Sequence, residues 1–153
     1  MRPIRARCFL LLAGLALAAC GNPNGPEDPQ RSLDENRRKF RAVVGSSYRV
    51  DYQHQCFCSP ETVAPVRLTV REGSIVGVEP LSAAGALPPE RWGAYRTVEG
   101  VFDAIQEAFT RGARRVTVEY DPDQGYPADV DIDYQRELDA WDGFKLSHVA
   151  LLR

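Results

Sequence analysis

The feature that most constrains the fold is a helix pattern followed by three strand patterns, which occurs twice along the chain. In the strand patterns, polar and apolar side chains alternate with a period of two, and the short links between consecutive strands favour antiparallel pairing. We therefore predict an α+β domain of order α-β-β-β-α-β-β-β, in which the two halves form a possible pseudo-repeat. It contains one curved antiparallel sheet, or two abutting three-stranded sheets, with both helices on one face. The expected strands are residues 48–54, 66–70, 75–78, 116–120, 130–134 and 144–152.

Each predicted helix begins at a side chain that can cap its first backbone N–H groups. Ser32 as N-cap and Glu35 three residues later form a capping box, and the helix that they open is expected to stop at Gly45. Thr97 is expected to cap the second helix, which is predicted over residues 98–110. The apolar stripes that should face the core are Leu33, Phe40, Val43 and Val44 in the first helix, and Val98, Val101, Phe102, Ile105, Ala108 and Phe109 in the second.

The first 20 residues carry a separate signal, that of an exported lipoprotein. Three arginines precede an apolar run over residues 8–17, and small residues then lead to Cys20, as in a lipobox. The run is shorter than the roughly 20 apolar residues that a membrane-spanning helix needs. We therefore predict that residues 1–19 are a signal peptide, cleaved before Cys20, and that acyl chains on this cysteine anchor the protein. An ordinary signal peptide with a chance cysteine is the alternative.

The rest of the chain divides into a tether and one domain. Residues 20–31 are rich in Gly, Pro, Asn and Asp and are predicted to be a lipidated, flexible tether, whereas residues 32–153 are predicted to form a single globular domain. Removing residues 1–19 takes away three arginines and no acid, which leaves 16 basic against 21 acidic residues, a net charge of −5. This charge argues against nucleic acid as a partner, and it leaves membrane binding to the acyl chains. Gly21 after the lipidated cysteine implies, by resemblance to bacterial lipoproteins, delivery to the outer membrane, facing either side.

Cys56 and Cys58 are the cysteines that remain in an oxidising compartment once the leader and the lipid are accounted for. A disulfide between them should bend the chain, because residues i and i+2 of a full strand have Cα atoms about 6.6 Å apart, near the upper limit for a bridge. Such a bridge closes a very small loop, stabilises little and should be easily reduced, so a redox role is a second interpretation. A third is that His54, Cys56 and Cys58 share one strand face and bind zinc or copper.

Five aspartates crowd the segment 121–133, namely Asp121, Asp123, Asp129, Asp131 and Asp133. Like charges at alternate positions of one strand repel each other, so their face must be solvated or must hold a cation. The segment resembles the start of a calcium-binding loop, but it lacks the third acidic position before Gly125 and the distant glutamate. We favour a solvated strand face, and keep Asp121, Asp123 and Asp131 as weak calcium candidates.

No complete catalytic motif occurs in the sequence, which lacks a nucleophile elbow, a zinc-protease motif, a phosphate loop and a dinucleotide fingerprint. A His–Cys pair two residues apart also lacks a third group that would orient it. We therefore expect a non-catalytic envelope lipoprotein with no cofactor except its covalent lipid. Its open sheet face, or the long loop over residues 80–96, would bind another envelope protein. The alternative is a thiol–disulfide or metal-handling envelope protein that uses His54, Cys56 and Cys58.

Several motifs occur in a characteristic order along residues 32–152. They include Cys56-Phe57-Cys58, Thr97-Val98-Glu99-Gly100-Val101-Phe102, Tyr120-Asp121, and Gly125-Tyr126-Pro127 followed by Asp131 or Asp133. In this order they resemble domain of unknown function 6174, a family of small secreted or lipidated bacterial domains. Phe40 takes the place of a tryptophan that is frequent in the family's first helix, and His54 is not part of the pattern. The resemblance implies export and a shared fold, and it supplies no activity.

Overall fold

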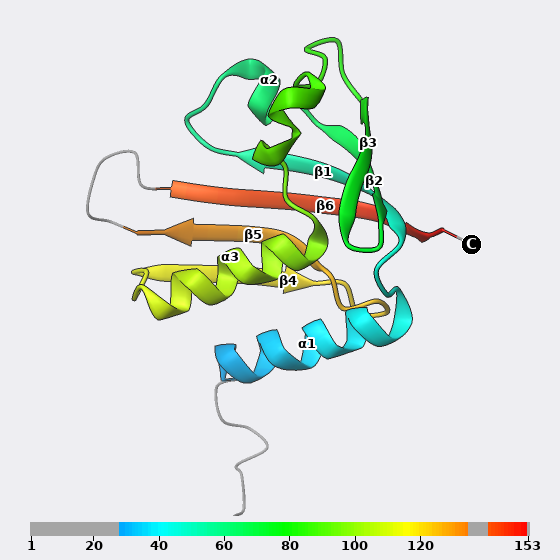
Figure 1. The fold of residues 1–153 in the computed structure, drawn as a ribbon. Helices are drawn as coiled ribbons and strands as arrows, with labels where there is room; N and C mark the ends of the chain where they lie inside the picture. Colours follow the sequence, from blue (N-terminus) through cyan, green and yellow to red (C-terminus); the bar gives the residue numbers. More distant parts are fainter. Residues whose placement is uncertain (1–27, 135–140, 153) are drawn as a thin grey trace, which may run out of the picture.

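A single six-stranded antiparallel sheet is the centre of the computed structural model, which describes residues 28–134 and 141–152 (Figure 1). The strands are β1 (Tyr48–Gln55), β2 (Val66–Arg71), β3 (Ser74–Pro80), β4 (Arg115–Tyr120), β5 (Pro127–Asp133) and β6 (Trp141–Leu151). They lie in the order β3-β2-β1-β6-β5-β4, so each half of the chain contributes a three-stranded meander and the pairing of β1 with β6 joins the two. The α+β class and the predicted order of helices and strands are confirmed, and the sheet is one rather than two.

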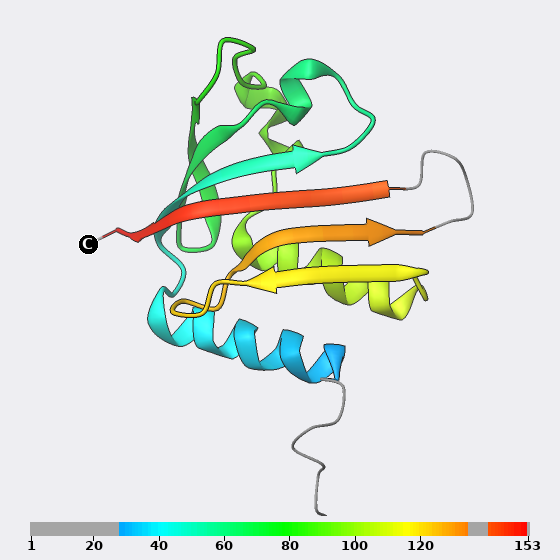
Figure 2. The same ribbon diagram turned by 180° about the vertical axis from the view of Figure 1, so that it is seen from behind.

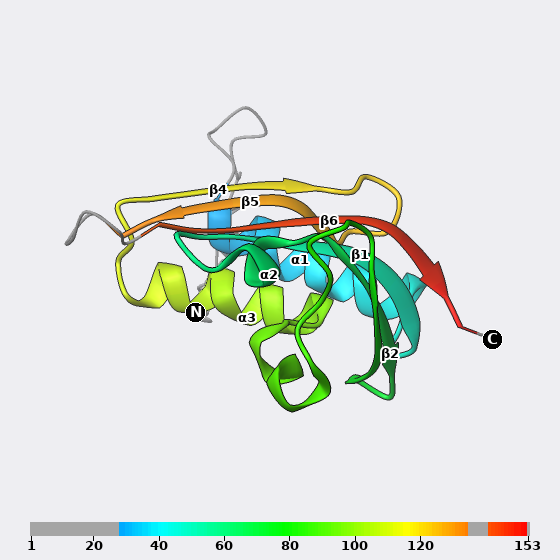
Figure 3. The same ribbon diagram turned by 90° about the horizontal axis from the view of Figure 1, so that it is seen from above.

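Two main helices, α1 (Pro29–Val43) and α3 (Val98–Thr110), lie on one side of the sheet (Figure 3). The view from behind shows the strands unobstructed, so the opposite face is open (Figure 2). The loops contain two shorter helical turns, α2 (Pro60–Val63) and η1 (Pro89–Ala94), the second within the long loop between the halves. None of the helices in the described part of the chain is long and apolar enough to cross a membrane.

The two halves are not simple copies of each other in space. The steps from β1 to β6, from β6 to β5 and from β5 to β4 are each antiparallel, so β1 and β4 run in opposite directions. A translation along the sheet that places β1 on β4 would therefore leave these two strands antiparallel. The two meanders cannot be superposed while both helices stay on one face.

Helix α1 begins earlier than predicted. The Asp28 side chain accepts a hydrogen bond from the backbone N–H of Gln30, and Pro29 occupies the first helical turn, where its missing N–H costs no hydrogen bond. The Gln30 side chain also exchanges hydrogen bonds with Gln106 of α3, at 2.7 and 3.0 Å. The prediction that Ser32 caps the helix is therefore wrong, because an aspartate–proline start lies upstream of it. The helix includes the last residues that the sequence assigned to the tether.

The helices bury most of the predicted apolar stripes. In α1, Leu33 and Phe40 are buried, as is Val44 at its C-cap, but Val43 is 46% exposed and its assignment to the stripe is wrong. In α3 the Thr97 side chain accepts a hydrogen bond from the Gly100 N–H, as predicted. The α3 stripe is buried except for Phe109, which is only partly covered. The first helix thus turns slightly more of its surface to solvent than its sequence pattern suggests.

Aromatic side chains tie both helices to β1. Phe40 lies edge-on to Tyr48 with ring centroids 5.4 Å apart, and 6.1 Å from the ring of Phe102 in α3. The Tyr48 hydroxyl accepts a hydrogen bond from the backbone N–H of Val98, the first residue of α3. Burial raises the pKa of Tyr48 to about 12, so this hydroxyl stays protonated. The start of α3 is thereby fixed to the first strand.

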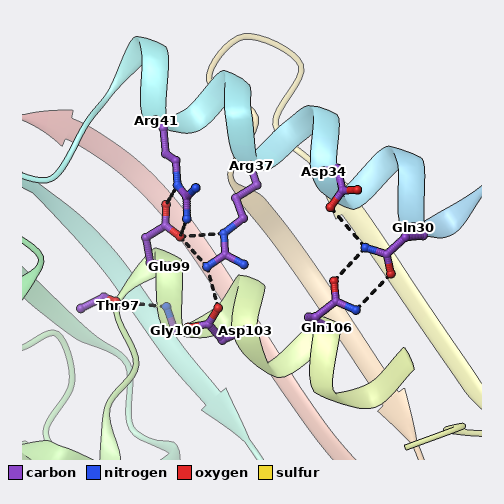
Figure 4. A network of polar contacts seen from close by, with 9 residues as sticks. All are labelled: Gln30, Asp34, Arg37, Arg41, Thr97, Glu99, Gly100, Asp103 and Gln106. Carbon is purple, nitrogen blue, oxygen red and sulfur yellow. Dashed lines mark hydrogen bonds and ion pairs between the residues drawn. The ribbon is translucent and has the colours of Figure 1, made fainter. Parts of the chain in front are cut away.

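A charged network joins α1 to α3 along their shared side (Figure 4). The Glu99 carboxylate accepts hydrogen bonds from Arg37 at 2.8 Å and from Arg41 at 2.7 Å, and Arg37 also donates to Asp103. Burial by itself would raise the pKa of Glu99, but the hydrogen bonds from Arg41 and Arg37 outweigh it and hold the pKa below its usual range. The network therefore contributes to the packing of the helices at neutral pH, and loses that contribution as Glu99 is protonated in acid.

Candidate functional site

The two cysteines lie in the bend that follows β1. Cys56 and Cys58 form a disulfide, with their Cα atoms 5.3 Å apart. The strand ends at Gln55, and Pro60 opens α2 just beyond the bend. The chain thus gives up the extended spacing of a strand where the bridge forms, as the separation of the two cysteines predicts.

His54 connects this disulfide to the neighbouring strand β6. Its ring stacks on that of Phe144, its partner across the two strands, with centroids 5.1 Å apart and planes 7° from parallel. Two residues earlier in β6, Asp142 accepts a hydrogen bond from Nε2 of His54 at 2.5 Å. An ionised carboxylate only accepts hydrogen bonds, so Nε2 carries the proton. In the neutral ring, Nδ1 is then the unprotonated nitrogen. That Nδ1 lies 3.6 Å from Sγ of Cys56, which places Asp142, His54 and Cys56 in one continuous row.

The two sulfur atoms have different surroundings. The side chains of His54 and Asp142 are mostly covered, with 18% and 29% of their surface exposed, and Cys56 is half-buried beside them. Cys58 is exposed, and Phe57 between the cysteines is 76% exposed. The Phe57 ring packs edge-on against Trp141, the first residue of β6, with ring centroids 6.3 Å apart. The disulfide therefore has a sheltered sulfur and an open one.

A carboxylate, an imidazole and a sulfur in a row form the arrangement that activates cysteine in thiol chemistry. Sequence reasoning identified His54, Cys56 and Cys58 but found no third group to orient the imidazole. The third group is Asp142, which is 88 positions from His54 along the chain. Only the pairing of β1 with β6 brings it there, and no local motif marks it.

The set proposed as metal ligands is also brought together. Donor atoms of His54, Cys56 and Cys58 all lie within 4.8 Å of one another. Thiolate sulfur is the form of cysteine that binds metal ions, and in the oxidised pair each sulfur is bonded to the other. Metal binding at this cluster therefore requires the disulfide to be reduced first.

The aspartates of the β4–β5 hairpin have other partners. The Asp121 carboxylate accepts hydrogen bonds from the backbone N–H groups of Asp123 and Gln124, at 3.0 and 2.7 Å, and so closes the turn itself. The aspartates on the open face of β5 lie next to cations, in the pairs Asp129–Lys145, Asp131–Arg115 and Asp133–Arg114. This is the charge balance of a solvated strand face, the interpretation that the sequence favours.

The open face carries a further group of paired charges on β1, β2 and β6. Asp51 of β1 accepts two hydrogen bonds from Arg67 of β2, at 2.6 and 2.9 Å, and lies 3.1 Å from Nδ1 of His148. The hydrogen bond from Arg67 holds the pKa of Asp51 below its usual range. These charges are engaged with one another, so the face is less free to bind a charged partner than its composition suggests.

A hollow of about 540 Å³ opens near the start of β1, at the opposite end of that strand from the disulfide. It is lined by Tyr48 and Thr97 and by the charged groups of Arg41 and Glu99. Those two charges are paired with each other, at 2.7 Å. The hollow thus offers a ligand mainly neutral surface, and the disulfide remains the stronger candidate site.

Comparison with curated proteins and with solved structures finds no match. A family model described as a family of unknown function, DUF6174, matches residues 32–142. The matched range includes the cysteine pair, His54 and Asp142, and it spans the motifs on which the resemblance seen in the sequence rests. The chain therefore belongs to DUF6174, a family whose function is unknown.

Proposed function

We propose that this protein is an envelope lipoprotein, anchored to the outer membrane by lipid on Cys20, whose domain exchanges its Cys56–Cys58 disulfide with thiols of other envelope proteins. The observation that carries the chemical part is the row formed by Asp142, His54 and Cys56, which ends on a disulfide sulfur. The lipobox carries the anchoring part, and it lies outside the described residues.

In this proposal the protein disulfide is the oxidant and a pair of substrate thiols is the reductant. Two thiols lose two electrons and two protons and become a disulfide, while Cys56 and Cys58 gain both and become thiols. The row of side chains supports such a step because an imidazole held by a carboxylate can pass a proton to or from the neighbouring sulfur. The exposure of Cys58 supports it because exchange needs direct access to a sulfur atom.

The exchange function is tested by incubating the full chain, purified in detergent, with glutathione buffers of different potential and with a reduced peptide dithiol. We expect two thiols to appear per chain as the peptide becomes oxidised, at a reduction potential above the value of about −300 mV below which structural disulfides lie. The Cys56→Ser/Cys58→Ser double variant should oxidise no peptide. A disulfide that stays intact in every buffer and leaves the peptide reduced would contradict the proposal.

The anchor is tested separately, by growing cells with a labelled fatty acid and separating their membranes by density. The wild-type chain should carry the label and sediment with the outer membrane, whereas Cys20→Ser should lose the label because the acceptor thiol is gone. Cys8→Ser is the matched control, since it removes a cysteine from the apolar run and leaves the lipobox intact. Labelling of Cys20→Ser would show that Cys20 is not the lipid site.

A second candidate function is binding of another envelope protein without redox chemistry. Phe57 favours it, because a large apolar side chain that is 76% exposed can anchor a partner. Crosslinking in the envelope followed by purification distinguishes the two functions. A partner captured equally by wild type and by the double cysteine variant would favour binding alone.

A further inference from the structure

We infer that substrate thiols attack Cys58, that Cys56 is the sulfur that leaves, and that the substrates are polypeptide cysteines with apolar neighbours. This inference rests on the proposed exchange function and adds a direction and a substrate class to it. It follows from the unequal surroundings of the two sulfur atoms and from the aromatic side chain between them.

Access distinguishes the two sulfurs as targets. Cys58 lies on the surface, whereas Cys56 is half-buried and has the His54 ring beside it. Thiol–disulfide exchange proceeds at the sulfur that an incoming thiolate can reach. Cys58 is therefore the atom at which the mixed disulfide forms.

Stabilisation of the departing sulfur distinguishes them as leaving groups. Nδ1 of His54 lies 3.6 Å from Sγ of Cys56, and Asp142 is placed to stabilise the imidazolium form of the ring. A sulfur whose negative charge is stabilised departs faster, so attack on Cys58 with departure of Cys56 is favoured by both effects. Asp142 acts through His54 and is a positioning residue.

The first step can be written with all atoms accounted for. A substrate thiolate bonds to Sγ of Cys58, the bond between Cys56 and Cys58 breaks, and its electron pair leaves on Sγ of Cys56. The proton that the substrate thiol loses is taken up through solvent at Nδ1 of the neutral His54 ring, and the imidazolium so formed gives that proton to Sγ of Cys56. A second substrate thiol attacks the substrate sulfur of the mixed disulfide, which releases the oxidised substrate and leaves Cys58 as a thiol.

The position of Phe57 indicates the substrate class. Its ring lies next to Cys58 in the sequence, is largely exposed and packs edge-on against Trp141, so an exposed aromatic side chain stands one residue from the attacked cysteine. A polypeptide with apolar residues next to its cysteine would cover this ring on approach, and a small hydrophilic thiol would not. Burying much of one phenylalanine ring corresponds to about a tenfold preference.

The attacked sulfur is identified by mixing the oxidised full chain with excess monothiol peptide, quenching in acid within seconds, and alkylating free thiols. Mass spectrometry of the digest should find the peptide on Cys58 and the alkyl group on Cys56 at the earliest times. The reverse assignment would overturn the inference and leave the exchange function standing. Absence of any mixed disulfide and of any peptide oxidation would instead overturn the exchange function itself.

The role of His54 is tested on the same reaction with His54→Gln and Asp142→Asn. Both variants should slow the release of Cys56 by about tenfold or more and flatten the dependence of the rate on pH, because proton transfer to the leaving sulfur is impaired. Asp129→Asn, an aspartate on the open face of β5, is the matched control and should change neither quantity. A pH profile that is the same in all four proteins would overturn the role of His54 as proton donor.

The substrate class is tested with two peptides of equal length, one with leucines and one with serines beside its cysteine. Wild type should react about tenfold faster with the leucine peptide, and in Phe57→Ser the ratio of the two rates should fall to about one. Equal rates of the two peptides with wild type would overturn the assignment of apolar substrates.

Discussion

Replacing Gly125 by alanine is expected to destabilise the domain by about 3 kcal/mol, a large share of the stability of a typical domain. Gly125 has φ = +78°, a left-handed conformation that costs an L-residue roughly 1–2 kcal/mol. A Cβ at this position would lie 2.7 Å from the backbone oxygen of Asn36 and 3.0 Å from Cβ of Lys39, both in α1. Helix and turn would have to separate, and overpacking of this kind costs about 1–3 kcal/mol more.

The measurement is urea unfolding followed by circular dichroism, with Gly45→Ala as the matched control. Gly45 has the same φ of +78°, but a Cβ there would have no neighbour within 4 Å. The control therefore carries the backbone cost alone, and the difference between the two variants measures the contact of the turn with α1. Equal losses of stability in the two variants would show that this contact is not close.

The same glycine explains a motif that the sequence left ambiguous. The segment from Asp121 to Gly125 resembles the beginning of a calcium loop, but its carboxylate closes the turn and its glycine allows α1 to approach. The Lys39 ammonium also donates a hydrogen bond to the carbonyl oxygen of Pro122 in this turn. The packing of helix α1 on this hairpin turn therefore accounts for the pattern of aspartate, proline and glycine.

The strands could be predicted from sequence because alternation of side chains reports burial directly. Tyr48, Val50 and Tyr52 are all buried, as their period of two predicts. Helix α3 could be predicted equally well from the sequence, because Thr97 marks its start and no competing N-cap residue lies upstream. Sequence could not decide between one sheet and two, because the pairing of β1 with β6 joins opposite ends of the chain and leaves no local pattern.

The same long-range pairing limited what the sequence could say about the site. His54, Cys56 and Cys58 are close in the chain and reactive by type, so residue chemistry alone pointed to them. Asp142 is one of many aspartates, and it gains its role only because β6 lies beside β1 and turns this side chain toward His54. The sequence favours a non-catalytic protein in part because it shows no such group, whereas the position of Asp142 beside His54 supports the proposed exchange function.

Replacing Phe40 by alanine is expected to destabilise the domain by about 3–5 kcal/mol, the usual cost of removing a buried aromatic side chain from a core. Phe40 has no exposed surface, and its ring contacts Tyr48 of β1 and Phe102 of α3. The cavity would therefore open where α1, the sheet and α3 meet. Neither Tyr48 nor Phe102 is free to fill it, because each is itself buried and held by other contacts.

The matched control for Phe40 is Val43→Ala, three residues later in the same helix. The sequence pattern places both side chains in one apolar stripe, but Val43 is 46% exposed and loses little when shortened, about 0.5 kcal/mol or less. The free energies of urea unfolding of the two variants therefore show whether Val43 is buried, as the sequence pattern predicts, or exposed, as in the structure. A shared large loss would mean that α1 is rotated to bury Val43. A loss confined to Phe40→Ala agrees with the observed orientation, in which Arg37 and Arg41 also face Glu99.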